Sequence, residues 1–104
     1  MKTIININGT DYPVKHSIRA RLIYEQHFGL KRMWQETTLT DQYVYFWACC
    51  KAADPDFNKT YDEFTDMLDD NPVAFKSFAE FLAKALTDEA QMLYDNSKNG
   101  SAKN

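Results

Sequence analysis

Oxygen-bearing side chains recur at every second position between residues 54 and 62, in the order Asp54, Asp56, Asn58, Thr60 and Asp62. This spacing is typical of a calcium loop, in which alternate residues supply the oxygen ligands. The sixth position of such a loop needs glycine for its sharp turn, and the twelfth needs a bidentate glutamate. The chain has Lys59 and Thr65 at these positions. We therefore interpret the stretch as a polar loop that leads into a capped helix, and we expect no calcium binding.

The remaining reactive side chains form no catalytic or metal-binding pattern. Cys49 and Cys50 are neighbours within an apolar run, and His16 and His27 lie far from them in the sequence. Small thiols in such a run are typical of core residues in a reducing compartment. The chain has no glycine-rich phosphate loop and no recognisable set of nucleophile, base and orienting group. We therefore predict a protein that is not an enzyme and that binds no metal or cofactor.

Composition and charge limit the classes to which the protein can belong. The 104 residues are 44% apolar and 14% aromatic, which excludes a disordered chain and is enough for one domain with its own core. The N-terminus is too short and polar for a signal peptide, and the longest apolar run falls short of the roughly 20 residues of a membrane helix. We expect a soluble, cytoplasmic protein with no membrane partner.

The net charge of −3 is unevenly distributed along the chain. Residues 1–34 carry six basic and two acidic side chains, residues 35–96 carry four and thirteen, and the last eight residues carry two lysines. An acidic body argues against general nucleic-acid binding, because neutralisation of phosphates drives that affinity. The basic first third is interpreted as pairing with the acidic body, and the alternative that it meets an acidic partner stays open.

The stretch that must organise the fold is the apolar run at residues 43–50. As a helix it is apolar on nearly every face, so other segments have to surround it. We predict a central helix at about 41–53 with Thr40 as its N-cap. In this helix we expect Phe46, Cys50 and at least one of Tyr43 and Trp47 to be buried.

Turn and cap signals define the other elements. Asn8-Gly9 predicts a type I′ hairpin at about 2–15, in which the proline at position 13 requires an edge or a bulge. Ser17 begins a helix that Gly29 ends, and Thr60 with Glu63 forms a capping box. An asparagine N-cap at position 71, followed by proline at N1, begins the last helix.

These signals together predict an α+β fold, predominantly α. The N-terminal β-hairpin packs on about four helices, near residues 17–28, 41–53, 61–69 and 72–93. The hairpin's Ile5, Ile7, Tyr12 and Val14 must pack on these helices, because an isolated hairpin is marginally stable in water. We predict a single globular domain at 1–94 and a flexible C-terminal tail at 95–104.

Aromatic residues are the most informative candidates for partner contacts. The chain has fifteen Phe, Trp and Tyr residues, and several of them fall in loops or near the ends of elements. Exposed aromatic side chains often anchor interfaces. We interpret Trp34, Tyr45 and Phe57 as candidate partner contacts. The alternative that Trp34 and Phe57 fold back over the core stays open.

The order of these features resembles that of the small tail assembly chaperones of long-tailed (siphovirus-type) bacteriophages and prophages. The resemblance is carried by residues 4–15, 17–20, 24–29, 38–41, 58–64 and 69–72, and it spans about residues 2–90. Each segment alone indicates only a hairpin, a cap or a turn, and it is their order that matches.

The resemblance implies a non-catalytic protein that binds the tape measure protein, together with the tail tube protein in some cases, during tail assembly in the host cytoplasm. The family has no catalytic motif, so the resemblance assigns no site residues. The alternative hypothesis is a small phage-encoded regulatory or nucleic-acid-binding protein. It would use the basic first third, with Arg19, Arg21, Lys31 and Arg32 facing phosphates.

Overall fold

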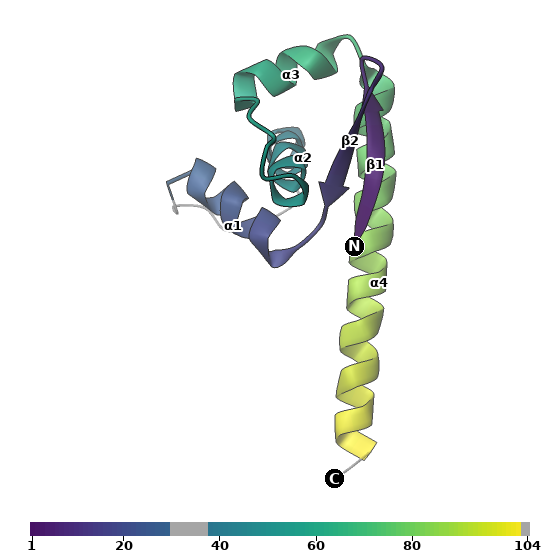
Figure 1. Cartoon of the computed structure of the whole chain (residues 1–104). Helices are drawn as coiled ribbons and strands as arrows, with labels where there is room; N and C mark the ends of the chain where they lie inside the picture. Colours follow the sequence, from purple (N-terminus) through teal and green to yellow (C-terminus); the bar gives the residue numbers. More distant parts are fainter. Residues whose placement is uncertain (30–37, 103–104) are drawn as a thin grey trace.

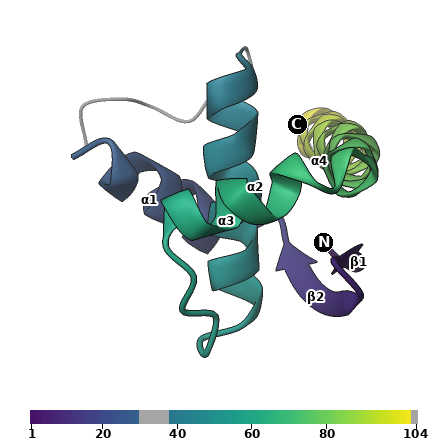
Figure 2. The same ribbon diagram turned by 90° about the horizontal axis from the view of Figure 1, so that it is seen from above.

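The computed structural model describes residues 1–29 and 38–102, with side chains described as far as residue 95. The fold is α+β and mostly helical, as predicted: a two-stranded antiparallel hairpin packs on four helices (Figure 1). The elements are β1 (Lys2–Ile7), β2 (Thr10–Lys15), α1 (Ile18–His27), α2 (Leu39–Ala53), α3 (Tyr61–Asp69) and α4 (Pro72–Ala102). Seen from above, α1 lies on one side of α2, and the hairpin and α4 lie on the other (Figure 2).

The hairpin turns at the predicted dipeptide. Asn8 and Gly9 have φ values of 56° and 86°, the positive values that both central residues of a type I′ turn require. Ile7 pairs with Thr10 across the turn, and the register continues to Lys2 opposite Lys15. The inward side chains behave as predicted: Ile5, Ile7 and Val14 are buried, and Tyr12 packs against the core. The hairpin is therefore one wall of the core.

Helix α2 is the central element, as predicted, but its details differ from the prediction. Phe46 and Cys50 are fully buried, whereas Tyr43 and Trp47 are only partly buried, so the expectation that one of this pair is buried is wrong. The prediction that Thr40 caps the helix is also wrong. Thr38 is the N-cap, and its side chain accepts a hydrogen bond from the Asp41 backbone at 3.1 Å.

Aromatic rings fill the centre of the core. Phe46 of α2 stacks on Phe78 of α4 with ring centroids 4.3 Å apart, and it meets Phe64 of α3 edge-on at 4.9 Å. Rings in such contacts stabilise a core beyond the apolar area that they bury. One residue of α2 therefore connects three helices.

The turn between α3 and α4 holds the tip of the hairpin. Helix α3 begins with the predicted capping box of Thr60 and Glu63. Asn71 follows α3, and its side chain accepts a hydrogen bond from the Asn8 backbone at 3.3 Å and donates one to the Asn8 side chain. The Asn71 side chain, predicted to cap α4, thus attaches the hairpin turn to the helical corner.

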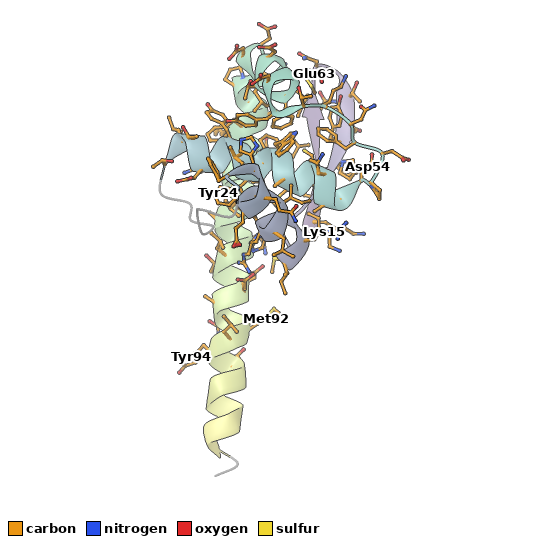
Figure 3. The ribbon with its side chains drawn as sticks, turned by 90° about the vertical axis from the view of Figure 1, so that its left-hand side faces the viewer. Lys15, Tyr24, Asp54, Glu63, Met92 and Tyr94 are labelled. Atoms are coloured by element: carbon orange, nitrogen blue, oxygen red, sulfur yellow. The ribbon has the colours of Figure 1, made fainter. Side chains whose placement is uncertain are left out.

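Helix α4 is longer than predicted. It has 31 residues and ends at Ala102 rather than near residue 93. Extending a helix that already exists is cheap compared with nucleating one, so the polar residues after position 93 need not stop it. Its C-terminal part projects beyond the other elements (Figures 1 and 3). The structure therefore places a helix over most of residues 95–104, and the flexibility of that segment stays a prediction.

Candidate functional site

Two of the three predicted partner contacts lie in the core. Tyr45 is 1% exposed and Phe57 is 8% exposed. The expectation that these rings are exposed is therefore wrong, and for Phe57 the alternative of folding back over the core is correct. Phe57 meets Tyr12 and Phe64 edge-on, at 5.8 and 6.0 Å between ring centroids. Trp34 lies outside the described residues.

Tyr45 instead belongs to a polar cluster that sequence reasoning missed. Its hydroxyl lies 2.7 Å from Nδ1 of His16, which is itself only 4% exposed. On the other side of the imidazole, Nε2 lies 2.9 Å from a Glu89 oxygen, and the second Glu89 oxygen accepts a hydrogen bond from Arg21 at 2.6 Å. We call His16, Arg21, Tyr45 and Glu89 the His16 cluster. No sequence motif links these residues, because they come from four separate segments.

A neutral imidazole satisfies the contacts of His16 with Tyr45 and Glu89. A neutral imidazole with its hydrogen on Nε2 donates to Glu89 and accepts from the Tyr45 hydroxyl at Nδ1. Burial lowers the pKa of His16 from its ordinary value of 6.5, and the nearby Arg21 adds to this, although Glu89 opposes it. The hydrogen bond from Arg21 in turn lowers the pKa of Glu89. The cluster therefore holds a neutral histidine against an ionised carboxylate.

The cysteines next to the His16 cluster are not activated as nucleophiles. Cys49 and Cys50 are fully buried and free of disulfides. Burial raises the pKa of Cys50 to about 12, and it raises the pKa of Cys49 as well. A nucleophilic cysteine needs a lowered pKa and access to a substrate. The His16 cluster is instead suited to attaching α4 to α1 and α2, because Glu89 belongs to α4, Arg21 to α1 and Tyr45 to α2.

The loop from residue 54 to residue 60 uses its polar groups for its own structure. Asp54 accepts a hydrogen bond from the Asp56 backbone at 2.9 Å, and the Lys59 carbonyl accepts one from the Trp47 indole at 2.9 Å. Within the described residues, no group of three or more His, Cys, Asp or Glu side chains is placed to hold a metal ion. The same part of the chain contains no helix with the length and apolarity to cross a membrane.

The basic first third is partly engaged within the molecule. Arg21 pairs with Glu89, as the interpretation of internal charge pairing predicts. Arg19 is exposed, and Lys31 and Arg32 lie outside the described residues. Of the four basic residues that the nucleic-acid hypothesis would use, the described part of the chain therefore presents Arg19 to solvent.

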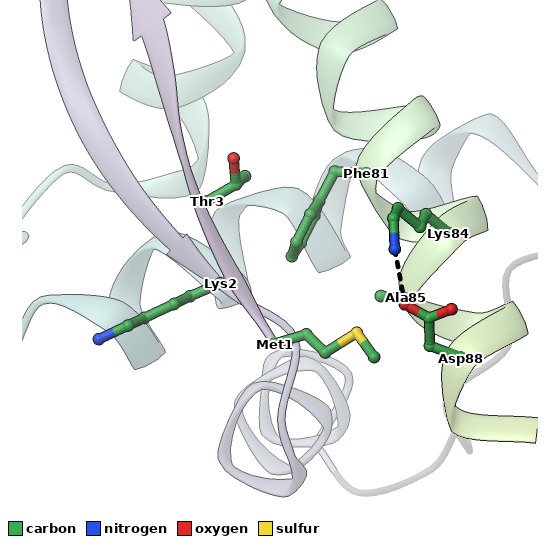
Figure 4. Close-up of a pocket in the computed structure, with 7 residues that line it drawn as sticks. All are labelled: Met1, Lys2, Thr3, Phe81, Lys84, Ala85 and Asp88. Carbon is green, nitrogen blue, oxygen red and sulfur yellow. Dashed lines mark hydrogen bonds and ion pairs between the residues drawn. The ribbon is translucent and has the colours of Figure 1, made fainter. Parts of the chain in front are cut away.

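A groove runs between the start of β1 and α4 (Figure 4). Its volume is about 340 Å³, and it is lined by Met1, Lys2, Thr3, Phe81, Lys84, Ala85 and Asp88. The Phe81 ring, which is half-buried, points from α4 toward the strand (Figure 4). The Lys84 ammonium donates a hydrogen bond to Asp88 at 2.8 Å, so these two charges neutralise each other at one rim. The floor is thus apolar and the rim is charged.

The projecting part of α4 carries the other candidate surface. Met92, Leu93 and Tyr94 are exposed by 60, 62 and 62%. Met92 and Tyr94 are labelled on this part of the helix in Figure 3. The apolar stripe that faces the core follows a spacing of four and three residues, through Phe78, Leu82 and Ala85. Continued along the helix, the same spacing reaches position 89 and then Met92. Position 89 is Glu89 of the His16 cluster, so the core-facing side of α4 continues into solvent with Met92 on it and Leu93 next to it.

Comparison with known proteins adds no assignment: no protein-family model, no curated protein and no solved structure matches this chain.

Proposed function

We propose that this protein is a tail assembly chaperone of a long-tailed bacteriophage or prophage. In this role it binds a helical, aggregation-prone segment of the tape measure protein in the host cytoplasm and performs no chemistry. The observation that carries the proposal is the projecting part of α4, which presents Met92 in line with the core stripe and Leu93 next to it, and we call these two residues the α4 seam. A spacing of four and three residues is that of a coiled-coil seam, so a client helix can pack along it.

The size of this surface suits a client that must later be released. A few apolar side chains beside acidic residues form a small interface with a charged rim, and such interfaces are weaker than large dry ones. Asp88 and Asp95 lie on the same helix as Met92. The negative body also keeps several copies apart on one long client through like-charge repulsion. The resemblance in the order of the sequence features is the second support for the proposal.

The test is co-expression of the neighbouring tape measure gene product with this chain. We expect the wild-type chain to keep the client soluble and to be retained with it on an affinity resin. A Met92→Asp, Leu93→Asp double variant should lose most of the retained client, because it places two carboxylates in the seam. The matched control is Ala83→Asp with Ala90→Asp, which adds the same charge at two exposed positions of α4. A client that is equally insoluble with and without the wild-type chain would contradict the proposal.

A further inference from the structure

The outer edge of β1 has unpaired backbone groups. Residues that flank a two-residue hairpin turn form a hydrogen-bonded pair, and such pairs alternate along the ladder. Ile7 and Thr10 flank this turn, so the residues at 5 and 3 also bond to β2. The pattern continues beyond the strands, where the His16 backbone donates to the Met1 carbonyl at 2.8 Å. The backbone groups of Lys2, Ile4 and Asn6 therefore point away from β2, and none of them has a backbone partner among the described residues.

The two edges of the hairpin differ. Pro13 is opposite Ile4 in the register, so its missing N–H lies on the outer edge of β2. A proline at such a position prevents a further strand from pairing there. The edge of β1 carries no proline, and Ile4 is 63% exposed on the outer face. Only the β1 side of this hairpin can be extended by another strand.

The groove beside β1 provides a floor for an added strand. Neighbouring strands lie about 4.8 Å apart, so a third strand would run next to β1 and above the side of α4 that lines the groove. Every second side chain of that strand would point toward Phe81 and Ala85. Such side chains must be apolar, because the floor offers them a ring and a methyl group.

The charges at the end of the hairpin indicate what else the strand carries. Lys2 and Lys15 are directly opposite each other in the register, and like charges in that position destabilise a strand pair. Neither lysine has an acidic partner within the described residues. A carboxylate at this end would relieve the repulsion.

We propose that the outer edge of β1 binds an extended segment of a partner protein as a third, antiparallel strand. The segment has alternating apolar residues that cover Phe81, and an acidic residue near its C-terminal end that faces Lys2 and Lys15. This surface is separate from the α4 seam of the proposed function and does not depend on it.

A second copy of this chain does not fit the same edge. In an antiparallel pair of β1 strands, both α4 helices would lie on the same face of the joined sheet. The groove between β1 and α4 places each α4 below the position of the third strand, which in this pair is the β1 strand of the other copy. The two α4 axes would therefore be only about one strand spacing apart, about 4.8 Å. Packed helices need about 8–10 Å between their axes. The occupant is therefore a strand that brings no helix of its own below the sheet.

The probe is a synthetic eight-residue peptide in which valine alternates with threonine and the last residue is aspartate. The threonines form the hydrogen-bonded pairs with Lys2, Ile4 and Asn6, so their amides point to β1 and their side chains lie on the outer face with Ile4. The valines alternate with them, so the valine side chains point to the floor of the groove. Two derivatives carry N-methyl groups, one on the threonine nitrogens and one on the valine nitrogens. We expect the threonine derivative to bind at least about tenfold more weakly than the valine derivative in an NMR titration, since it loses the donors that face β1.

The protein side of the experiment uses Ile4→Pro, with Ile4→Thr as the matched control. Ile4→Pro removes an outward N–H that the hairpin does not use, so the fold should persist and peptide binding should fall about tenfold, whereas the control should bind as the wild type does. Slower amide exchange at Lys2, Ile4 and Asn6 in the complex would support the proposal. Equal affinity for the two derivatives, no binding at millimolar peptide, or a dimer that the peptide dissociates would overturn it. If Ile4→Pro does not fold, the two derivatives decide the question.

Discussion

At the scale of single residues, two tyrosines of the core form hydrogen bonds with buried polar side chains. Among the side chains that the structure describes, two polar ones are almost completely buried, His16 at 4% and Asp41 at 0% exposed. Each is bonded to the hydroxyl of a tyrosine on another element: Tyr45 lies 2.7 Å from His16, and Tyr24 donates to Asp41 at 2.5 Å. Loss of a hydrogen bond by a buried polar group costs about 1–3 kcal/mol, so phenylalanine in place of either tyrosine would destabilise the fold. These two rings are therefore used inside the molecule.

Phe46→Ala should destabilise the fold by about 3–5 kcal/mol, because the side chain is fully buried and its removal leaves a cavity between three helices. That is a large part of the 5–15 kcal/mol typical of a domain. Urea unfolding followed by circular dichroism measures the change. Ile18→Ala is the control, because Ile18 is 73% exposed and its truncation should lower the free energy of unfolding much less. An unchanged midpoint in the Phe46 variant would contradict the packing described above.

The His16 cluster predicts that stability falls on acidification. The pKa of His16 is lowered below 6.5 in the folded state, so the unfolded chain binds more protons just below that pH. The pKa of Glu89 is lowered from 4.5, and its contribution is lost as the pH falls further, through the folded pKa. Both groups therefore act in the same direction, in two successive pH ranges.

His16→Gln should remove the pH dependence of the free energy of unfolding in the first range, just below pH 6.5, and leave the pH dependence in the second, more acidic range unchanged. The measurement is the free energy of unfolding between about pH 7 and pH 4, compared between wild type and variant. Glu89→Gln should reduce the pH dependence in the more acidic range. Because the Glu89 side chain is partly exposed, this effect should be small. If the wild-type free energy of unfolding instead increases as the pH is lowered from about 7 to about 5, His16 is charged in the folded state.

At the scale of elements, local signals in the sequence predict where helices and turns begin. The Asn8-Gly9 turn, the Ser17 cap, the capping box of Thr60 and the α3 boundaries all follow from nearest neighbours along the chain. Contacts between distant residues do not, because nothing in the sequence fixes which side chains meet. His16 and Glu89 are 73 positions apart, and the sequence gives no sign that they meet. The same limit explains why Tyr45 was expected to be exposed.

Asn71→Ala should detach the hairpin tip from the helical corner. It removes the hydrogen bond to the Asn8 side chain. It also removes two hydrogen bonds to the backbone, from the Asn8 N–H at 3.3 Å and to the Met67 carbonyl at 3.1 Å. Two such hydrogen bonds contribute about 1–3 kcal/mol. Asn8→Gly is the matched control, because it keeps the positive φ and the backbone donor and loses only the side chain. Hydrogen exchange at the turn should increase in the first variant and much less in the second.

The loop that precedes α3 should not bind calcium, because Lys59 and Thr65 stand where a calcium loop needs glycine and glutamate. Isothermal titration with millimolar calcium is the measurement, and a flat trace is expected. The variant Asp56→Ala serves as the control. A binding isotherm that this substitution abolishes would show that the loop rearranges around the ion.

At the scale of the whole molecule, α4 has two roles along one helix. Its first half closes the core through Phe78, Leu82 and Ala85, and its second half projects into solvent. The molecule is 53 Å long and at most 30 Å across, and the helix, at about 1.5 Å per residue, accounts for most of that length. The residues from 91 to 95 are all exposed. The fold can therefore be expected to lose little when the projection is removed, whereas binding of a client along it should be lost.

A chain that ends at residue 90 separates these two roles. It keeps Glu89 and hence the His16 cluster, so its melting temperature should lie within a few degrees of the wild-type value. It lacks Met92 and Leu93, so it should no longer keep the tape measure protein soluble on co-expression. The control ends at residue 95 and retains the whole exposed apolar set, and it should keep most of the client. If the shorter chain is folded and retains the client as well as the control does, the α4 seam is not the binding surface. In that case the edge of β1 becomes the surface to test against the same client.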